Sequence, residues 1–308
     1  MGRKVIKHGP STLIVSLPSG WVKQQGIRKG DEIDCRQEGG QLIFTPKQTA
    51  HAQQVSLDVR RMEPFLVDRF LARSYQKGYD RILLTHHSLE LLEVIRKKVT
   101  ELIGFDIMEQ NDKTCLIQSI ADRINLDFDS SLRKVYLLLK AIIQDIRDAY
   151  QKRDYGQLSS LFLRDLEVNR LAYYCLRCIN KAQLRESVPR YEQKLLYYLC
   201  ERLEDLGDRL KHVARHLSLS KTLNKKIAAL LGQLCAQYDL AYHYYYKPSV
   251  EAANASLHIY HKMKKQLDDI LANPRSSSEL WALFLITQAM GIIYHIVTMR
   301  LDAIQEGR

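Results

Sequence analysis

A helical spacing of apolar side chains, sustained over more than half of the chain, is the feature that most limits the fold. From about residue 127 to residue 305, apolar residues recur every three or four positions, which is the spacing of one face of an α-helix. Breaks that contain proline, glycine, asparagine or serine divide this region and predict helices at about 128–153, 157–187, 190–217, 222–247, 250–272 and 277–305. Three helices fall in each half, 127–217 and 222–305, so we expect tandem three-helix bundles.

The predicted helix at 190–217 carries the most regular apolar seam. Its residues step by three and four positions: Leu196, Leu199, Leu203, Leu206, Leu210, Val213 and Leu217. We expect this narrow seam to pack against neighbouring helices.

A polar stripe lies on the same helix, on the side opposite the seam. It consists of Glu201, Asp205, Asp208 and His212. Converging carboxylates with an imidazole suit a divalent or iron ion. A solvated acidic face, paired with Arg202 and Arg209, is the alternative, because such stripes are common on helix surfaces.

The stretch Leu280–Met299 contains no Asp, Glu, Lys or Arg and is long enough to cross a bilayer. Four polar residues interrupt it: Thr287, Gln288, His295 and Thr298. We expect it to be the buried last helix of the second bundle, in a protein that is not membrane-embedded. A membrane-spanning helix is the alternative.

Two regions of different character precede the helices. Residues 1–47 predict short strands with tight turns at 4–7, 12–17, 32–37 and 41–46, and a short helix that starts after Pro18 and ends at Gly26. Because this unit is too small to bury a core alone, we expect a second chain to complete it. Residues 53–120 alternate strands with helices, which predicts a small α/β layer.

The fold class is therefore multi-domain α+β, with domains at 1–47, 53–120 and 127–305. No G-x-G-x-x-G, P-loop, H-E-x-x-H or G-x-S-x-G motif is found, so we do not expect an enzyme. We expect His86 and His87 to lie in a solvated loop, the tyrosines at 242–246 to pack in the bundle, and Cys175 and Cys178 to be helix cysteines without a metal.

Positive charge is concentrated at the start of the chain. The net charge is +11 and the pI is about 9.3, and residues 1–29 hold six cations and no acid: Arg3, Lys4, Lys7, Lys23, Arg28 and Lys29. A polyanion such as DNA is a natural partner for such a segment. The start lacks the apolar run of a secretory signal and the cysteines are scattered, so we expect a cytoplasmic protein.

Residues 3–47 resemble the AbrB/MazE/SpoVT family of swapped-hairpin DNA-binding domains. The likeness lies in the basic first strand, the G-x-x-T turn at 9–12, Pro18 before the short helix, and G-I-x-x-G-D at 26–31. The resemblance implies a homodimer formed by hairpin exchange on double-stranded DNA. Carried over by position, the DNA-contacting residues are Arg3, Lys4, Lys7, His8, Ser11 and Thr12.

Residues from about 127 to 305 resemble the PhoU family of phosphate-uptake regulators, which are paired three-helix bundles. The segment Tyr198-Leu-Cys-Glu-Arg-Leu-Glu-Asp205 is similar to that family's E(D)xxxD metal motif, with Glu201 and Asp205 at the motif positions. Asp165 and Asn169 resemble a second copy in which asparagine replaces the last acid, and residues 290–295 of the second half carry no acid. The resemblance implies one metal site at most, with Asp165, Asp208 and His212 as possible further ligands.

With both regions in one chain, the arrangement resembles that of archaeal-type PhoU-related regulators with an N-terminal AbrB-like domain. They imply a DNA-binding transcriptional or signalling regulator linked to phosphate uptake, with 53–120 as a connecting or dimerisation segment. One alternative is an adaptor that binds a phosphate-transporter ATPase or kinase and uses the hairpin unit only to dimerise. Another is an antitoxin-like regulator.

Overall fold

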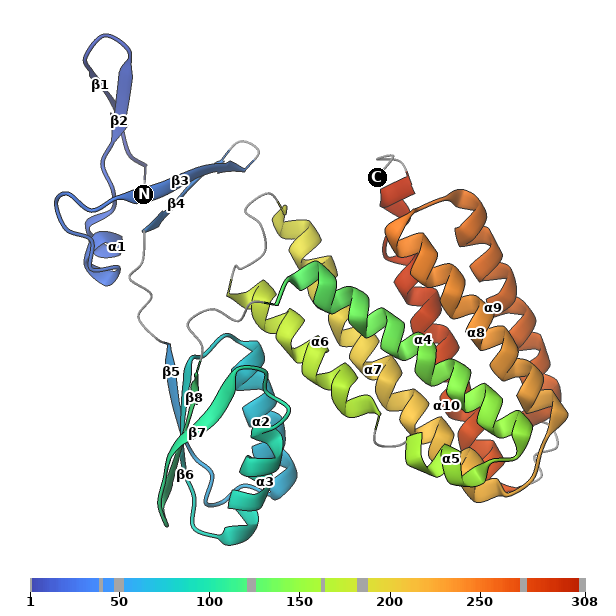
Figure 1. The fold of residues 1–308 in the computed structure, drawn as a ribbon. Coiled ribbons are helices and arrows are strands. Elements are labelled where there is room, and N and C mark those ends of the chain that lie inside the picture. Colours follow the sequence, from blue (N-terminus) through green and yellow to red (C-terminus); the bar gives the residue numbers. More distant parts are fainter. Residues whose placement is uncertain are drawn as a thin grey trace. The chain divides into compact units, whose positions relative to one another are not determined.

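The computed structural model describes residues 2–38, 41–46, 53–120, 126–161, 164–181, 188–271 and 276–304. The chain divides into two compact units, Met1–Ala52 and Gln53–Arg308 (Figure 1). Small sheets lie toward the N-terminus and a helical region follows them, so the mixed α+β class predicted from the sequence is confirmed.

The first unit consists of two antiparallel hairpins with a short helix between them (Figure 1). Its elements are β1 (Val5–His8), β2 (Thr12–Val15), α1 (Ser19–Gln24), β3 (Ile33–Glu38) and β4 (Gln41–Pro46). The β1–β2 turn contains Gly9, whose φ of 78° lies in the left-handed region that glycine adopts without steric cost. No described side chain of this unit is buried, so the predicted lack of a core is confirmed for a single chain.

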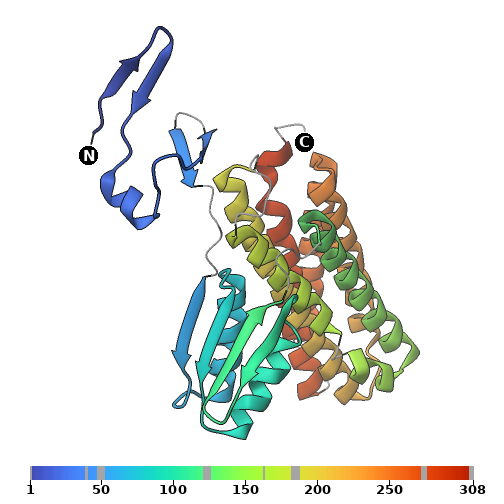
Figure 2. The ribbon, with the colours of Figure 1, turned by 60° about the vertical axis from the view of Figure 1, so that its left-hand side comes forward.

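The second unit begins with a four-stranded sheet. The elements are β5 (Gln54–Asp58), α2 (Pro64–Gln76), β6 (Arg81–Thr85), α3 (Leu89–Val99), β7 (Phe105–Gln110) and β8 (Thr114–Ser119). The strand order is β5-β6-β8-β7, in which only the β5–β6 pair is parallel. The helices α2 and α3 cover one face of the sheet (Figures 1 and 2), and the core beneath them includes Tyr75, Ile82 and Ile95.

The helical region completes the second unit. Its helices are α4 (Phe128–Lys152), α5 (Tyr155–Ser160), α6 (Asp165–Asn180), α7 (Arg190–Ser220), α8 (Lys225–Tyr246), α9 (Val250–Leu271), α10 (Ser277–Thr298) and the short 3₁₀ helix η2 (Leu301–Ile304). The seam of α7 is confirmed, because its residues from Leu199 to Leu217 are buried and Leu196 packs against the same core.

One hydrophobic core runs through both halves of the helical region. The last helix, α10, packs against α7 of the first half as well as against α8 and α9 of its own half. The two halves therefore share a core.

Three details of the sequence prediction are wrong. The single helix expected at 157–187 is two helices, because α5 ends at Ser160 and α6 starts anew at Asp165; residues 182–187 lie outside the described part. Apolar residues keep their spacing across this break, whereas acidic residues in the first turn of α6 mark a helix start. The last α-helix ends at Thr298, and η2 follows it.

His86 is the third correction. Its side chain is buried, and neither imidazole nitrogen has a hydrogen-bond partner within the described structure. Only His87 is exposed as expected. Strand β6 alternates buried and half-exposed positions, and His86 continues that alternation one residue beyond the strand.

Candidate functional site

The residues predicted to contact DNA all lie on the first hairpin or next to it. All of them are exposed: Arg3, Lys4, Lys7, His8, Ser11 and Thr12. Lys7 and His8 belong to β1, and Ser11 lies in the turn that leads into β2. No acid interrupts residues 1–29, so the charge of this hairpin is entirely positive.

The same hairpin exposes large apolar side chains. Five of its eight strand residues are exposed aliphatic residues: Val5, Ile6, Leu13, Ile14 and Val15. Leu13 is 68% exposed and Val5 63%. An isolated two-stranded hairpin is marginally stable in water, and these exposed side chains are available to pack against another surface.

The strand register places Lys7 and His8 on opposite faces of the hairpin. Lys7 pairs with Leu13 and His8 pairs with Thr12, and successive side chains point to opposite faces. Lys7 therefore shares its face with Val5, Leu13 and Val15, whereas His8 shares the other with Ile6 and Ile14. Each face combines apolar side chains with one basic residue, so burying either face leaves a basic residue on the open one.

The acidic stripe of α7 is engaged by arginine. The carboxylate of Glu201 accepts two hydrogen bonds from Arg73 of α2. The two terminal nitrogens of the Arg73 guanidinium group donate them, over 2.6 and 3.4 Å. Asp205 pairs with Arg209 at 2.7 Å and with Arg202 at 3.2 Å.

Lys211 brings together two further predicted ligands. Its ammonium group contacts Asp208 at 2.8 Å and also Asp165 on the neighbouring helix α6. Burial raises the pKa of Asp165, although Lys211 acts in the opposite direction. Burial and the charge of Lys211 lower the pKa of His212.

The carboxylates of the predicted metal site are paired with cationic side chains. Arg73 contacts Glu201, Arg209 contacts Asp205, and Lys211 contacts Asp165. Among the residues that the structure describes, no three His, Cys, Asp or Glu side chains converge on a point that could hold an ion. The oxygen of Asn169, at the predicted second motif, is buried without a hydrogen-bond partner in that part of the chain.

A polar junction joins the α/β layer to the helical region, and sequence reasoning did not find it. Arg177 of α6 is 5% exposed and donates hydrogen bonds to the carbonyl oxygens of Tyr75 and Tyr79 and, at 2.7 Å, to the Asp80 carboxylate. Its guanidinium group also lies 4.8 Å from the ring centre of Phe105. A charged residue within the otherwise apolar segment 171–179 was the available signal.

Asp80 is the anion of this junction. Burial disfavours its charge, but Lys181, the backbone N–H of Gln53 and Arg177 together hold its pKa below the usual value. Arg177 shows the converse effect, because burial lowers its pKa although it remains a cation.

A second group of charged residues lies at the C-terminal end of α3. Lys98 contacts Glu101 at 2.6 Å and Asp68 at 3.0 Å, and its ammonium group lies 5.6 Å from the ring centre of Tyr173 on α6. The Tyr173 hydroxyl donates to Glu204, whose pKa is raised to about 7 by burial and by the nearby charges of Asp208 and Glu201.

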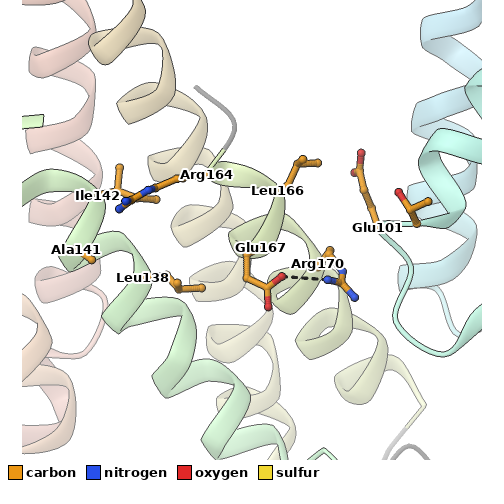
Figure 3. A pocket seen from close by; sticks show the side chains of 9 residues that line it. Glu101, Leu138, Ala141, Ile142, Arg164, Leu166, Glu167 and Arg170 are labelled. Atoms are coloured by element: carbon orange, nitrogen blue, oxygen red, sulfur yellow. Dashed lines mark hydrogen bonds and ion pairs between the residues drawn. The ribbon is translucent and has the colours of Figure 1, made fainter. Parts of the chain in front are cut away.

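A groove of about 510 Å³ lies beside Glu101, between the α/β layer and the helices α4 and α6 (Figure 3). Thr100 and Glu101 line one side, and Leu138, Ala141 and Ile142 of α4 with Leu166 and Arg170 of α6 line the other. Its two arginines pair with acids: Arg170 with Glu167 at 3.1 Å, and Arg164 with Asp145. The groove therefore offers mainly an apolar floor.

Two cysteines and several tyrosines of the helical region pack in its interior. Cys175 and Cys178 are free thiols and are buried, and burial raises the pKa of Cys178 to about 11. The ring of Tyr136 packs against the rings of Tyr242, Tyr245 and Tyr246. The prediction that the 242–246 tyrosines pack in the bundle is confirmed for these rings.

No family model, curated protein or solved structure matches this chain. The class of protein that its fold defines is a mixed α+β protein with small sheets toward the N-terminus and a helical region after them.

Proposed function

We propose that this protein is a homodimeric DNA-binding regulator linked to phosphate uptake, in which the first hairpins of two chains exchange and present their basic residues to double-stranded DNA. One observation carries the DNA-binding proposal: the segment 1–29 holds no acid, and its hairpin is exposed throughout. The exposed aliphatic residues of the hairpin support the dimer.

The link to phosphate rests on the resemblance of 127–305 to the PhoU family, whose paired bundles are the finer fold we propose for the helical region. Metal binding at Glu201 and Asp205 remains a prediction of that resemblance. A bound ion would have to displace Arg73 and Arg209 from these carboxylates. Elemental analysis of the purified full chain, beside the Glu201→Gln/Asp205→Asn variant, tests it.

A DNA shift assay across a range of salt concentrations tests DNA binding. A dimer presents Arg3, Lys4 and Lys7 twice, so it can neutralise about six phosphates. The logarithm of the DNA association constant should then fall with log[salt] at a slope of about −5. We expect Lys4→Ala/Lys7→Ala to weaken binding to all duplexes and to flatten this slope.

Lys262→Ala/Lys265→Ala is the matched control, since these two exposed lysines lie on α9. If both double variants bind genomic fragments as tightly as the parent, with the same salt slope, the hairpin only dimerises. Co-purification with a transporter ATPase or kinase would then favour the adaptor function, and neutralisation of a toxin would favour the antitoxin function.

A further inference from the structure

An exposed apolar patch lies where α7 ends and α10 begins. It consists of Leu219, Leu280, Trp281 and Phe284, hereafter the aromatic patch, and each of these side chains is about half exposed. Trp281 is 55% exposed and Phe284 50%. None of these residues contributes to the hairpin, the polar junction or the core.

The helices hold the aromatic patch in place. The ring of Trp281 stacks on His216 of α7 at 6.0 Å between centroids, and the ring of Phe284 meets Trp281 edge-on at 6.0 Å. The opposite face of α10 is buried against α7, α8 and α9. The exposed rings are therefore fixed on a rigid support.

Two exposed lysines adjoin the aromatic patch and form its basic rim. Lys221 follows the end of α7, and Lys225 is the first residue of α8. Thr222 and Asn224 approach the Glu279 carboxylate within 3.5 and 3.4 Å. These contacts bring the exposed Lys221 and Lys225 next to the first turn of α10. Glu279, the acid of that turn, is fully buried.

The area of the aromatic patch limits what can cover it. A large apolar side chain buries about 150–250 Å² at most, so four half-exposed ones offer roughly 400 Å² or less. A standard protein interface takes about 800 Å² from each partner, and somewhat more than half of it is apolar, so a protein partner would also have to cover the polar surroundings of the patch. A bilayer surface needs no such area, since a few aromatic rings at headgroup level and nearby lysines suffice for reversible binding.

We propose that the aromatic patch and its basic rim bind the surface of an anionic lipid bilayer, with the rings at headgroup level and the lysines against lipid phosphates. The helix α10 is long and apolar enough to cross a membrane, but 56% of its apolar window is buried inside the protein. Binding therefore involves only its outer face. This binding is independent of the DNA-binding function.

Vesicle sedimentation with the full chain tests the proposal. Vesicles of phosphatidylcholine with about one-third phosphatidylglycerol should pellet the parent protein, and pure phosphatidylcholine should not. We expect Trp281→Ser/Phe284→Ser and Lys221→Glu/Lys225→Glu each to weaken binding about tenfold or more. The control Phe65→Ser/Leu66→Ser removes equally exposed apolar side chains from α2 and should bind like the parent.

Fluorescence locates the contact. The chain has two tryptophans, Trp21 and Trp281, so Trp21→Phe leaves Trp281 as the reporter. Its emission should shift to the blue with anionic vesicles and stay unchanged with neutral ones.

The proposal is overturned if the Trp281 emission does not shift, or if the patch variants bind vesicles like the parent. It is also overturned if vesicle binding disappears only in Lys4→Ala/Lys7→Ala, or if the parent resists extraction from membranes by alkaline carbonate. A loss of mass by Trp281→Ser/Phe284→Ser in sedimentation equilibrium would instead assign the patch to contact between copies of this chain, which also overturns it.

Discussion

Arg177 shows how a single buried charge joins two parts of the second unit. It satisfies two carbonyl oxygens and one carboxylate beyond its own helix, so the α/β layer and α6 are bound through specific polar geometry as well as apolar contact. A buried polar group that is paired adds little to the free energy of unfolding. When one member of the pair is removed, the other is left buried without a partner, and this destabilises the fold.

We expect Arg177→Met to lower the free energy of unfolding by about 3–5 kcal/mol, since Asp80 and the carbonyl groups of Tyr75 and Tyr79 lose a buried donor. Urea denaturation measures the change. Arg170→Met is the control: Arg170 pairs with Glu167 at a more exposed site and should cost less than about 1 kcal/mol. Equal losses in the two variants would contradict the role given to Arg177.

Asp80 should make stability depend on pH in the acid range. Its pKa is lower in the folded protein than the usual value of 3.8, so the stabilisation is present above that value and is lost as the pH falls through the folded pKa. Comparison of Asp80→Asn with the parent between neutral pH and the acid limit should show a stability difference that shrinks toward low pH. Asp268→Asn, at an exposed position on α9, should show no such trend.

Among the elements, helices and strands with a clear period were predictable, and their partners were not. The spacing of apolar residues predicted both hairpins, the α/β layer and the seam of α7, because burial imposes that spacing locally. The break before Asp165 was missed because apolar spacing continues across it. The cation partners of Glu201 and Asp165 could not be predicted, since Arg73 and Lys211 lie on elements that are distant in the sequence.

Two glycines within helices should respond oppositely to substitution. A Cβ atom on Gly207 of α7 would lie 3.2 Å from a methyl group of Val168 on α6, whereas one on Gly232 of α8 meets nothing within 4 Å. We expect Gly232→Ala to raise the free energy of unfolding by about 0.5–1 kcal/mol through helix propensity. Gly207→Val should lower it by about 1–3 kcal/mol through overpacking. Thermal denaturation of both variants decides this, and a stabilising Gly207→Val would refute the close approach of α6 and α7.

At the scale of the whole molecule, the two compact units differ in how much core each encloses. The second unit buries an extensive core within one chain, whereas no described side chain of the first is buried. In the exchanged-hairpin dimer proposed above, the stability of the first unit would depend on protein concentration.

Removal of residues 1–52 should leave a folded second unit with weakened or abolished dimerisation. The full chain should sediment as a dimer at micromolar concentration, and its hairpin amides should exchange hydrogen faster on dilution while those of α7 do not. A full chain that is monomeric at this concentration would refute the exchanged-hairpin dimer. A truncated chain that dimerises as well as the parent would place the dimer contact in the second unit.

The core shared by both halves of the helical region also bears on how such a chain can be divided. Neither 128–220 nor 225–304 encloses its own apolar surface, because α10 fills the space beside α7. A gene split within the 221–224 turn should therefore yield two polypeptides that are insoluble apart and recover the native helical content when produced together. If the halves arose by duplication, their shared core now prevents either one from serving as an independent module.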